Sequence, residues 1–227
     1  MMQAPQDIEA RFGPDAAAVV TPRIGTPPIG DPVRSPAAAD RVRGSLVGAA
    51  IGDALGEPVE DRSRRWIAKR CGDVRGYLVP SPATSSDTLL TLITADSLLA
   101  DPVDHPTRLA ARLLGADVPT RGRSMKHART ELLAGRAWWQ AAMPRSAGTA
   151  GAARCASFGL LWAGDPRRAA YEAALSTSVT HGHPVATTAA AAFAAAVALA
   201  ARGDGPLDGA WIEAVTEIAA GFEQGAV

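Results

Sequence analysis

An alanine-rich stretch in the last quarter of the chain constrains the fold more than any other segment. Residues 185–201 carry no charge and are mostly alanine, with Thr187 and Thr188 near the start. Alanine favours the helix strongly but gains little on transfer into lipid, and the stretch is shorter than the roughly 20 residues that span a bilayer. We therefore expect a buried core helix against which other helices pack, and no membrane span.

The rest of the sequence indicates an all-α fold. Apolar residues recur at helical spacing, and no convincing alternation of apolar and polar residues indicates a β-strand. Helices are predicted over residues 41–56, 87–100, 107–114, 124–133, 150–162, 166–178, 185–201 and 207–222. Residues 1–39 are rich in proline and alanine and lack periodicity, so we expect a disordered or extended arm before a compact helical domain at residues 40–227.

The balance of charge argues against nucleic acid and anionic lipid as partners. Lys plus Arg and Asp plus Glu both number 23, so no net field draws the chain to nucleic acid or anionic lipid. The two cysteines, Cys71 and Cys155, lie far apart and in no metal-ligand spacing, which is typical of a reducing compartment. The first residues do not resemble a secretory signal. We expect a cytoplasmic protein that binds neither nucleic acid nor membrane.

The first predicted helix contains glycines at regular intervals. Gly44, Gly48, Gly52 and Gly56 recur every four residues, beginning after Asp40, a plausible N-cap. Each glycine inside a helix costs up to about 1 kcal/mol, so the row calls for a reason. It either lets a neighbouring helix approach closely or lets a ligand approach, and both explanations can hold.

The same helix ends in a group of carboxylates formed by Asp53, Glu57, Glu60 and Asp61. Negative charge at the C-terminal end of a helix opposes the helix dipole. This unfavourable placement hints at a ligand or a metal ion, although solvent-facing charge is the simpler account.

A tetrad of small polar residues marks the start of the second strong helix. Residues 85–88 read Ser-Ser-Asp-Thr, where a loop enters the helix. Hydroxyls and carboxylates at such a position cap the free backbone donors, with Ser85 or Ser86 as the cap. The alternative is a site for Mg²⁺ or Mn²⁺, which prefer oxygen ligands, but one carboxylate is too few unless others converge on it.

Two further segments are candidates for ligand contact. Residues 146–153 form a loop of small residues leading into a helix, where backbone amides suit phosphate and Arg154 could add a charge-assisted contact. Glycine in such a loop also serves tight turning alone. Residues 180–184 place His181 and His183 in a turn before the alanine-rich helix, where they could face a ligand or a metal or play a purely structural role.

The order of these segments resembles the ADP-ribosylglycohydrolase family. The similarity runs through RVRGSLVGAAIGDALGEPVE, SSDTLLTLITADSLL, SAGTAGAARCASFGLLWAGDP and SVTHGHPVATTAAAAFAAAVAL, over about residues 40–201. The resemblance implies an all-α fold that holds two Mg²⁺ or Mn²⁺ ions and cleaves the glycosidic bond between ADP-ribose and its conjugate. The implied partner is ADP-ribose or an ADP-ribosylated protein.

The resemblance also implies roles for individual residues. Ser85, Asp87 and Thr88 correspond to metal ligands of the family's Thr-Asp-Asp-Thr motif, and Asp87 and Glu60 to catalytic carboxylates. The implied ADP-ribose pocket is lined by Gly148, Thr149, Arg154, His181 and His183.

The chain departs from the family's pattern in three places. Ser86 stands where the motif has its first aspartate, and a neutral hydroxyl is a poorer ligand for a divalent ion. Thr149, Ala150 and Ala153 differ from the usual loop Gly-Asn-Gly-Ala-Ala-Met-Arg. No Asp-x-Asp-Thr motif follows residue 201, where Asp204 and Asp208 lie in a context that does not match.

Three hypotheses follow from this mixture of agreement and departure. The protein is an active hydrolase with a reduced or borrowed metal site, or an inactive relative that binds ADP-ribose, another nucleotide or a protein. The third is a fragment without its last helices, which would expose the apolar face that those helices cover.

Overall fold

The structure is a computed structural model that describes residues 4–25, 36–115, 122–203 and 205–222. The all-α prediction is confirmed: the described residues form helices and contain no strand, and an isolated bridge joins Met143 to His181. The helices are α1 (Ala4–Phe12), α2 (Pro14–Ile24), α3 (Ala39–Gly56), the short 3-10 helix η1 (Glu57–Val59), α4 (Arg64–Arg70), α5 (Ser86–Ala100), α6 (His105–Gly115), α7 (Arg123–Leu133), α8 (Trp138–Ala141), α9 (Ala150–Ala153), α10 (Ala156–Leu161), α11 (Pro166–Thr177), α12 (Pro184–Arg202) and α13 (Gly209–Ala220).

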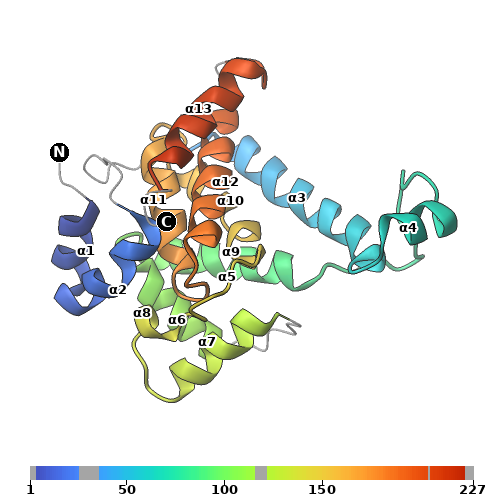
Figure 1. The fold of residues 1–227 in the computed structure, drawn as a ribbon. Coiled ribbons are helices and arrows are strands. Elements are labelled where there is room, and N and C mark those ends of the chain that lie inside the picture. Colours follow the sequence, from blue (N-terminus) through green and yellow to red (C-terminus); the bar gives the residue numbers. More distant parts are fainter. Residues whose placement is uncertain (1–3, 26–35, 116–121, 204, 223–227) are drawn as a thin grey trace.

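The alanine-rich helix α12 lies at the centre of the body, as expected (Figure 1). It packs against α9, α10, α11 and α13. Its buried residues are Ala186, Thr187, Ala190, Ala191, Ala194, Ala195 and Ala198. By length and composition α12 is the one described helix that could cross a membrane, but the core helix of a water-soluble domain meets the same criterion.

Small residues set the distance between α12 and its neighbours. A Cβ atom at Gly159 of α10 would lie 2.5 Å from the carbonyl oxygen of Ala194 and 2.8 Å from the amide nitrogen of Ala198. The backbones of α10 and α12 therefore meet without an intervening side chain. The helix predicted over residues 150–162 is divided into α9 and α10, because the backbone of Arg154 and Cys155 between them is not helical.

The expectation of a disordered arm is wrong for residues 4–25, which form α1 and α2. Ile8, Val20 and Ile24 are fully buried in the main hydrophobic cluster. Two short helices separated by Gly13 have little stability of their own, so their sequence carries a weak signal and packing on the body stabilises them. Residues 1–3 and 26–35 of the predicted arm lie outside the described residues.

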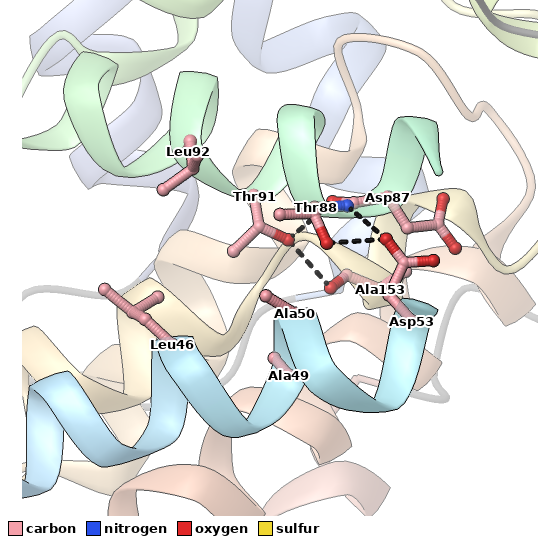
Figure 2. A pocket seen from close by; sticks show the side chains of 9 residues that line it. All are labelled: Leu46, Ala49, Ala50, Asp53, Asp87, Thr88, Thr91, Leu92 and Ala153. Atoms are coloured by element: carbon pink, nitrogen blue, oxygen red, sulfur yellow. Dashed lines mark hydrogen bonds between the residues drawn. The ribbon is translucent and has the colours of Figure 1, made fainter. Parts of the chain in front are cut away.

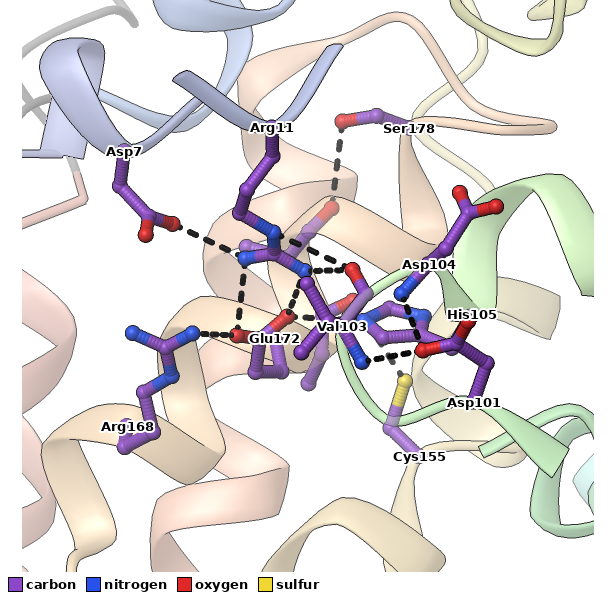
Figure 3. A network of polar contacts seen from close by, with 12 residues as sticks. Asp7, Arg11, Asp101, Val103, Asp104, His105, Cys155, Arg168, Glu172 and Ser178 are labelled. Carbon is purple, nitrogen blue, oxygen red and sulfur yellow. Dashed lines mark hydrogen bonds and ion pairs between the residues drawn. The ribbon is translucent and has the colours of Figure 1, made fainter. Parts of the chain in front are cut away.

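A buried ion cluster fixes α1 to the body (Figure 3). Arg11 donates to both carboxylate oxygens of Glu172 on α11, over 3.0 and 3.1 Å, and to Asp7 over 2.9 Å. It also donates to the carbonyl oxygen of Val103. Glu172 is fully buried. The N-terminal helix is thus bound to the core by charge as well as by apolar contact.

Helix α3 departs from its prediction. Ala38 rather than Asp40 occupies the N-cap position, and Asp40 instead pairs with Arg43 on the surface. Ala54 is its one buried residue, while Val47 and Ile51 are 52% and 45% exposed. A Cβ at Gly44, Gly48, Gly52 or Gly56 would meet nothing within 4 Å among the described residues. The glycine row is therefore not a helix-packing ridge in this part of the chain.

Candidate functional site

Asp53 joins the C-terminal part of α3 to the first turn of α5 (Figure 2). One carboxylate oxygen, Oδ2, accepts hydrogen bonds from the Ser85 amide at 2.9 Å, the Thr88 amide at 3.2 Å and the Thr88 hydroxyl at 2.5 Å. The Ser85 hydroxyl in turn accepts from the Asp87 amide at 3.0 Å, which confirms Ser85 as the N-cap. The side chain of Asp53 thus serves as a second cap, supplied by another helix.

The two carboxylates at this junction have opposite electrostatic environments. Burial alone would raise the pKa of Asp53, but the hydrogen bonds from Thr88 and Ser85 lower it below its usual value. Burial, followed by repulsion from Asp53, raises the pKa of Asp87. Oδ2 of Asp53 therefore holds the start of α5, whereas the carboxylate of Asp87 lines the adjoining cavity with a reduced preference for negative charge.

Replacing Asp53 with asparagine is expected to lower the free energy of unfolding by about 1–2 kcal/mol, because charge-assisted hydrogen bonds to the start of α5 are lost. Since folding lowers the pKa of Asp53, its contribution is present above the unfolded pKa of about 3.9 and is lost as the pH falls through the folded value. Urea unfolding across this acid range measures both effects. Asp73→Asn on an exposed ion pair is the matched control, and equal loss in both variants would contradict this role for Asp53.

A cavity of about 580 Å³ opens beside the start of α5. It brings together residues from three of the predicted motifs. The lining residues are Glu57, Glu60, Thr84, Ser85, Ser86, Asp87, Leu89, Leu90, Gly122, Thr149 and Ala150. A smaller adjoining cavity contains Asp53 and Thr88 between α3 and α5 (Figure 2). The acidic helix end, the Ser-Ser-Asp-Thr tetrad and the small-residue loop thus share one cavity.

Tertiary contacts hold the small-residue loop on the far side of this cavity. The Ser146 hydroxyl lies 2.5 Å from that of Ser124, at the start of α7. A Cβ at Gly151 would lie 2.4 Å from Thr177 on α11. Gly151 is therefore required for close packing, while Thr149 remains exposed at the cavity.

Arg154 lies in the interior, away from the cavity. It is fully buried, and its guanidinium donates to the carbonyl oxygen of Ser176 and to the Thr180 hydroxyl, each at 3.0 Å. The predicted direct contact with a phosphate does not match this position, because the guanidinium is fully buried and Arg154 does not line the cavity. Burial lowers the pKa of Arg154. Through these two hydrogen bonds Arg154 stabilises the turn that carries His181.

The two histidines of the predicted pocket have different environments. His181 is buried, its Nδ1 lies 2.8 Å from the Thr180 hydroxyl, and burial with the nearby Arg154 lowers its pKa to about 3. Its Nε2 lies 3.4 Å from the Cβ position of Gly148, so a neutral imidazole lies beneath the loop. Half-buried His183 caps α12, accepting from the Val185 amide at 3.2 Å.

Several carboxylates surround the start of α5. No group of three or more His, Cys, Asp or Glu side chains with metal-binding geometry occurs among the described residues. Asp53 accepts three hydrogen bonds through Oδ2, one of them from the Thr88 hydroxyl. Asp208 caps α13 through its Oδ1, and Asp204 lies outside the described residues. A tightly held divalent ion needs several oxygen ligands, and the carboxylates that line the space beside the start of α5 are Asp53, Glu57, Glu60 and Asp87.

Comparison with known proteins places this arrangement in a family. The model of the ADP-ribosylglycohydrolase family matches residues 34–226, which is most of the chain. The chain belongs to the ADP-ribosylglycohydrolase family. It is also 33% identical over 171 residues to an uncharacterised protein of Archaeoglobus fulgidus. That similarity covers 70% of this chain but 55% of the archaeal protein, so the chain spans little more than half the length of this relative.

Membership of the ADP-ribosylglycohydrolase family gives the cavity its chemical context. Family members act on ADP-ribosylated substrates and generally use divalent metals, and three of the four segments that carry the resemblance line the cavity. Asp53 belongs to the acidic group at the end of α3 and takes part in the site, although the sequence motifs do not assign it there. Its spacing from Leu46 and Ala50, which face the same small cavity, was the available signal.

Proposed function

We propose that this protein binds the ADP-ribose group of ADP-ribose conjugates in the cavity between the start of α5 and the loop at Thr149. The observation that carries the proposal is the single cavity of about 580 Å³ shared by Ser85, Ser86, Asp87, Thr149 and Ala150. A volume of this size suits a nucleotide-sized ligand. Loop hydroxyls and amides on one side would contact phosphate and ribose oxygens, and the carboxylates on the other would approach the glycosidic carbon.

Hydrolysis of the conjugate is proposed to be strongly impaired in this chain. Asp87 and Glu60 are the carboxylates that would direct water or stabilise positive charge on the ribose. Mg²⁺ or Mn²⁺, when bound, would polarise the oxygens of the ribose or of the attacking water. Ser86 replaces a carboxylate and the described residues lack a three-ligand cluster, so we favour ligand binding without efficient turnover.

Titration calorimetry with ADP-ribose, with and without Mn²⁺, tests this proposal together with a hydrolysis assay on an ADP-ribosylated arginine peptide. We expect binding of ADP-ribose that depends little on Mn²⁺, and slow or no release of ADP-ribose from the peptide. Absence of ADP-ribose binding under both conditions would contradict the proposed function. Rapid Mn²⁺-dependent turnover would instead support the active-hydrolase alternative.

Replacing Ser86 with aspartate is expected to raise the affinity for Mn²⁺ by about tenfold or more, since a carboxylate facing the cavity beside Asp87 supplies a charged oxygen ligand. Calorimetry with Mn²⁺ alone measures this change. Ser86→Asn, which has nearly the same shape but no charge, is the matched control. Equal affinity in the two variants would show that Ser86 does not occupy a ligand position.

A further inference from the structure

The segment between η1 and α5 projects from the helical body and contains α4 (Figure 1). We call residues 62–79 the basic arm. Ile67 and Cys71 are partly buried, and every other residue of the arm is exposed. No other described helix packs extensively against α4. Because the segment buries so little of its surface, packing against the helical body stabilises it only slightly.

Positive charge is concentrated on the basic arm. Five exposed cations lie within nine residues: Arg62, Arg64, Arg65, Lys69 and Arg70. None of the five forms an ion pair with a carboxylate among the described residues, whereas Arg43, Arg112 and Arg167 on the body each do. Asp73, the carboxylate within the arm, already pairs with Arg75 at 3.0 Å. The chain as a whole therefore has balanced charge, whereas the basic arm carries more cations than carboxylates, and five of these cations form no ion pair with a described carboxylate.

An aromatic ring lies among these cations. Trp66 is 37% exposed, and the guanidinium carbons of Arg62 and Arg70 lie 5.1 and 6.0 Å from its ring centroid. The three side chains are spaced by four residues and therefore follow one side of the arm. Cation–π contact of this kind holds both charges beside an amphipathic indole that remains accessible to solvent.

Exposed apolar side chains continue the surface beyond α4. Val74, Tyr77, Leu78 and Val79 are 37–50% exposed. Together with Trp66 they make the arm rich in large apolar groups as well as in cations. Aliphatic groups beside unpaired cations and interfacial aromatic rings are the combination that favours the boundary between lipid headgroups and acyl chains.

We propose that the basic arm docks on the surface of an anionic lipid bilayer. The cations would contact lipid phosphates and carboxylates, while Trp66, Tyr77 and the aliphatic side chains enter the headgroup region. The aliphatic groups favour a bilayer over single-stranded nucleic acid, since Val74, Leu78 and Val79 offer no ring on which a base stacks. The surplus of positive charge supplies the complementarity to an anionic surface. Docking in this way is independent of the cavity and its ligand.

Sedimentation of the full chain with vesicles tests this proposal. The vesicles consist of phosphatidylserine in phosphatidylcholine, with pure phosphatidylcholine as the uncharged comparison. We expect the protein to sediment with the anionic vesicles and to be released by high salt. Arg65→Gln combined with Lys69→Gln should weaken partitioning by about tenfold or more. Leu78→Ser combined with Val79→Ser should also weaken it at constant charge.

Lys126→Gln combined with Arg145→Gln removes two exposed charges from the body and is the matched control, which should leave partitioning unchanged. A labelled single-stranded oligonucleotide is the competing probe. The proposal is overturned if the protein does not bind anionic vesicles, or if the arm and body variants lose vesicle partitioning equally. It is also overturned if the protein binds the oligonucleotide but not the vesicles. Circular dichroism of each variant confirms that a loss of partitioning does not arise from unfolding.

Discussion

Replacing Glu172 with glutamine is expected to lower the free energy of unfolding by about 3–5 kcal/mol, because the buried guanidinium groups of Arg11 and Arg168 lose the carboxylate that they share. Glu172 accepts from Arg11 at 3.0 and 3.1 Å and from His105 Nε2 at 2.8 Å, and it pairs with Arg168 (Figure 3). The side chains of all four residues are at least nine-tenths buried. Thermal and urea unfolding measure the loss.

The acid dependence of stability provides a second measurement on the same residue. Burial alone would raise the pKa of Glu172, but Arg11, His105 and Arg168 hold it well below its usual value. The carboxylate therefore contributes stability above the unfolded pKa of about 4.3, and this contribution is lost as the pH falls through the folded value. The Glu172→Gln variant should lack this part of the pH dependence.

An exposed ion pair supplies the control for the buried one. Glu217 pairs with Arg167 on the surface, and Glu217→Gln is expected to change the free energy of unfolding by no more than about 0.5 kcal/mol. If Glu172→Gln unfolds too readily to purify, Arg11→Gln tests the same cluster from the side of α1. A loss below about 1 kcal/mol for Glu172→Gln would show that the cluster does not stabilise the fold.

Two glycine-to-alanine changes are expected to act in opposite directions. Gly159→Ala places a methyl group 2.5 Å from the carbonyl oxygen of Ala194, so α10 and α12 must separate, at a cost of about 3 kcal/mol. Gly48→Ala on α3 places a methyl group that meets no described residue within 4 Å, and it replaces a poor helix former with the best one. This variant should be more stable than the native chain by about 0.5–1 kcal/mol.

Urea unfolding of the two variants measures whether each position needs glycine for close helix packing, or whether glycine there only lowers the helix propensity. A loss of stability at Gly48 would show that some unseen contact requires glycine there. Stability unchanged at Gly159 would show that α10 and α12 can adjust without cost. Either result would contradict the role that the structure gives to that glycine.

The start of α5 illustrates how far local sequence predicts the candidate site. A cap at Ser85 or Ser86 and a polar helix entry at residues 85–88 follow from capping rules that depend only on neighbouring residues, and the structure selects Ser85. The convergence of Asp53 on the same turn does not, because 32 residues separate it from Ser85 and the loop between them sets their approach. Arg154 shows the same limit: its type suits an anion contact, but its burial beneath the loop is decided by α11.

The sequence by itself determined the helical class, the central position of the alanine-rich segment and the family, because helical periodicity, residue size and motif order are local properties of the chain. Only the tertiary structure decided that residues 4–24 are helical, since α1 and α2 gain their stability from Glu172 and from the apolar core. It also decided that the Gly44–Gly56 row of α3 faces no described neighbour, because spacing indicates which residues share a face and not what lies against that face.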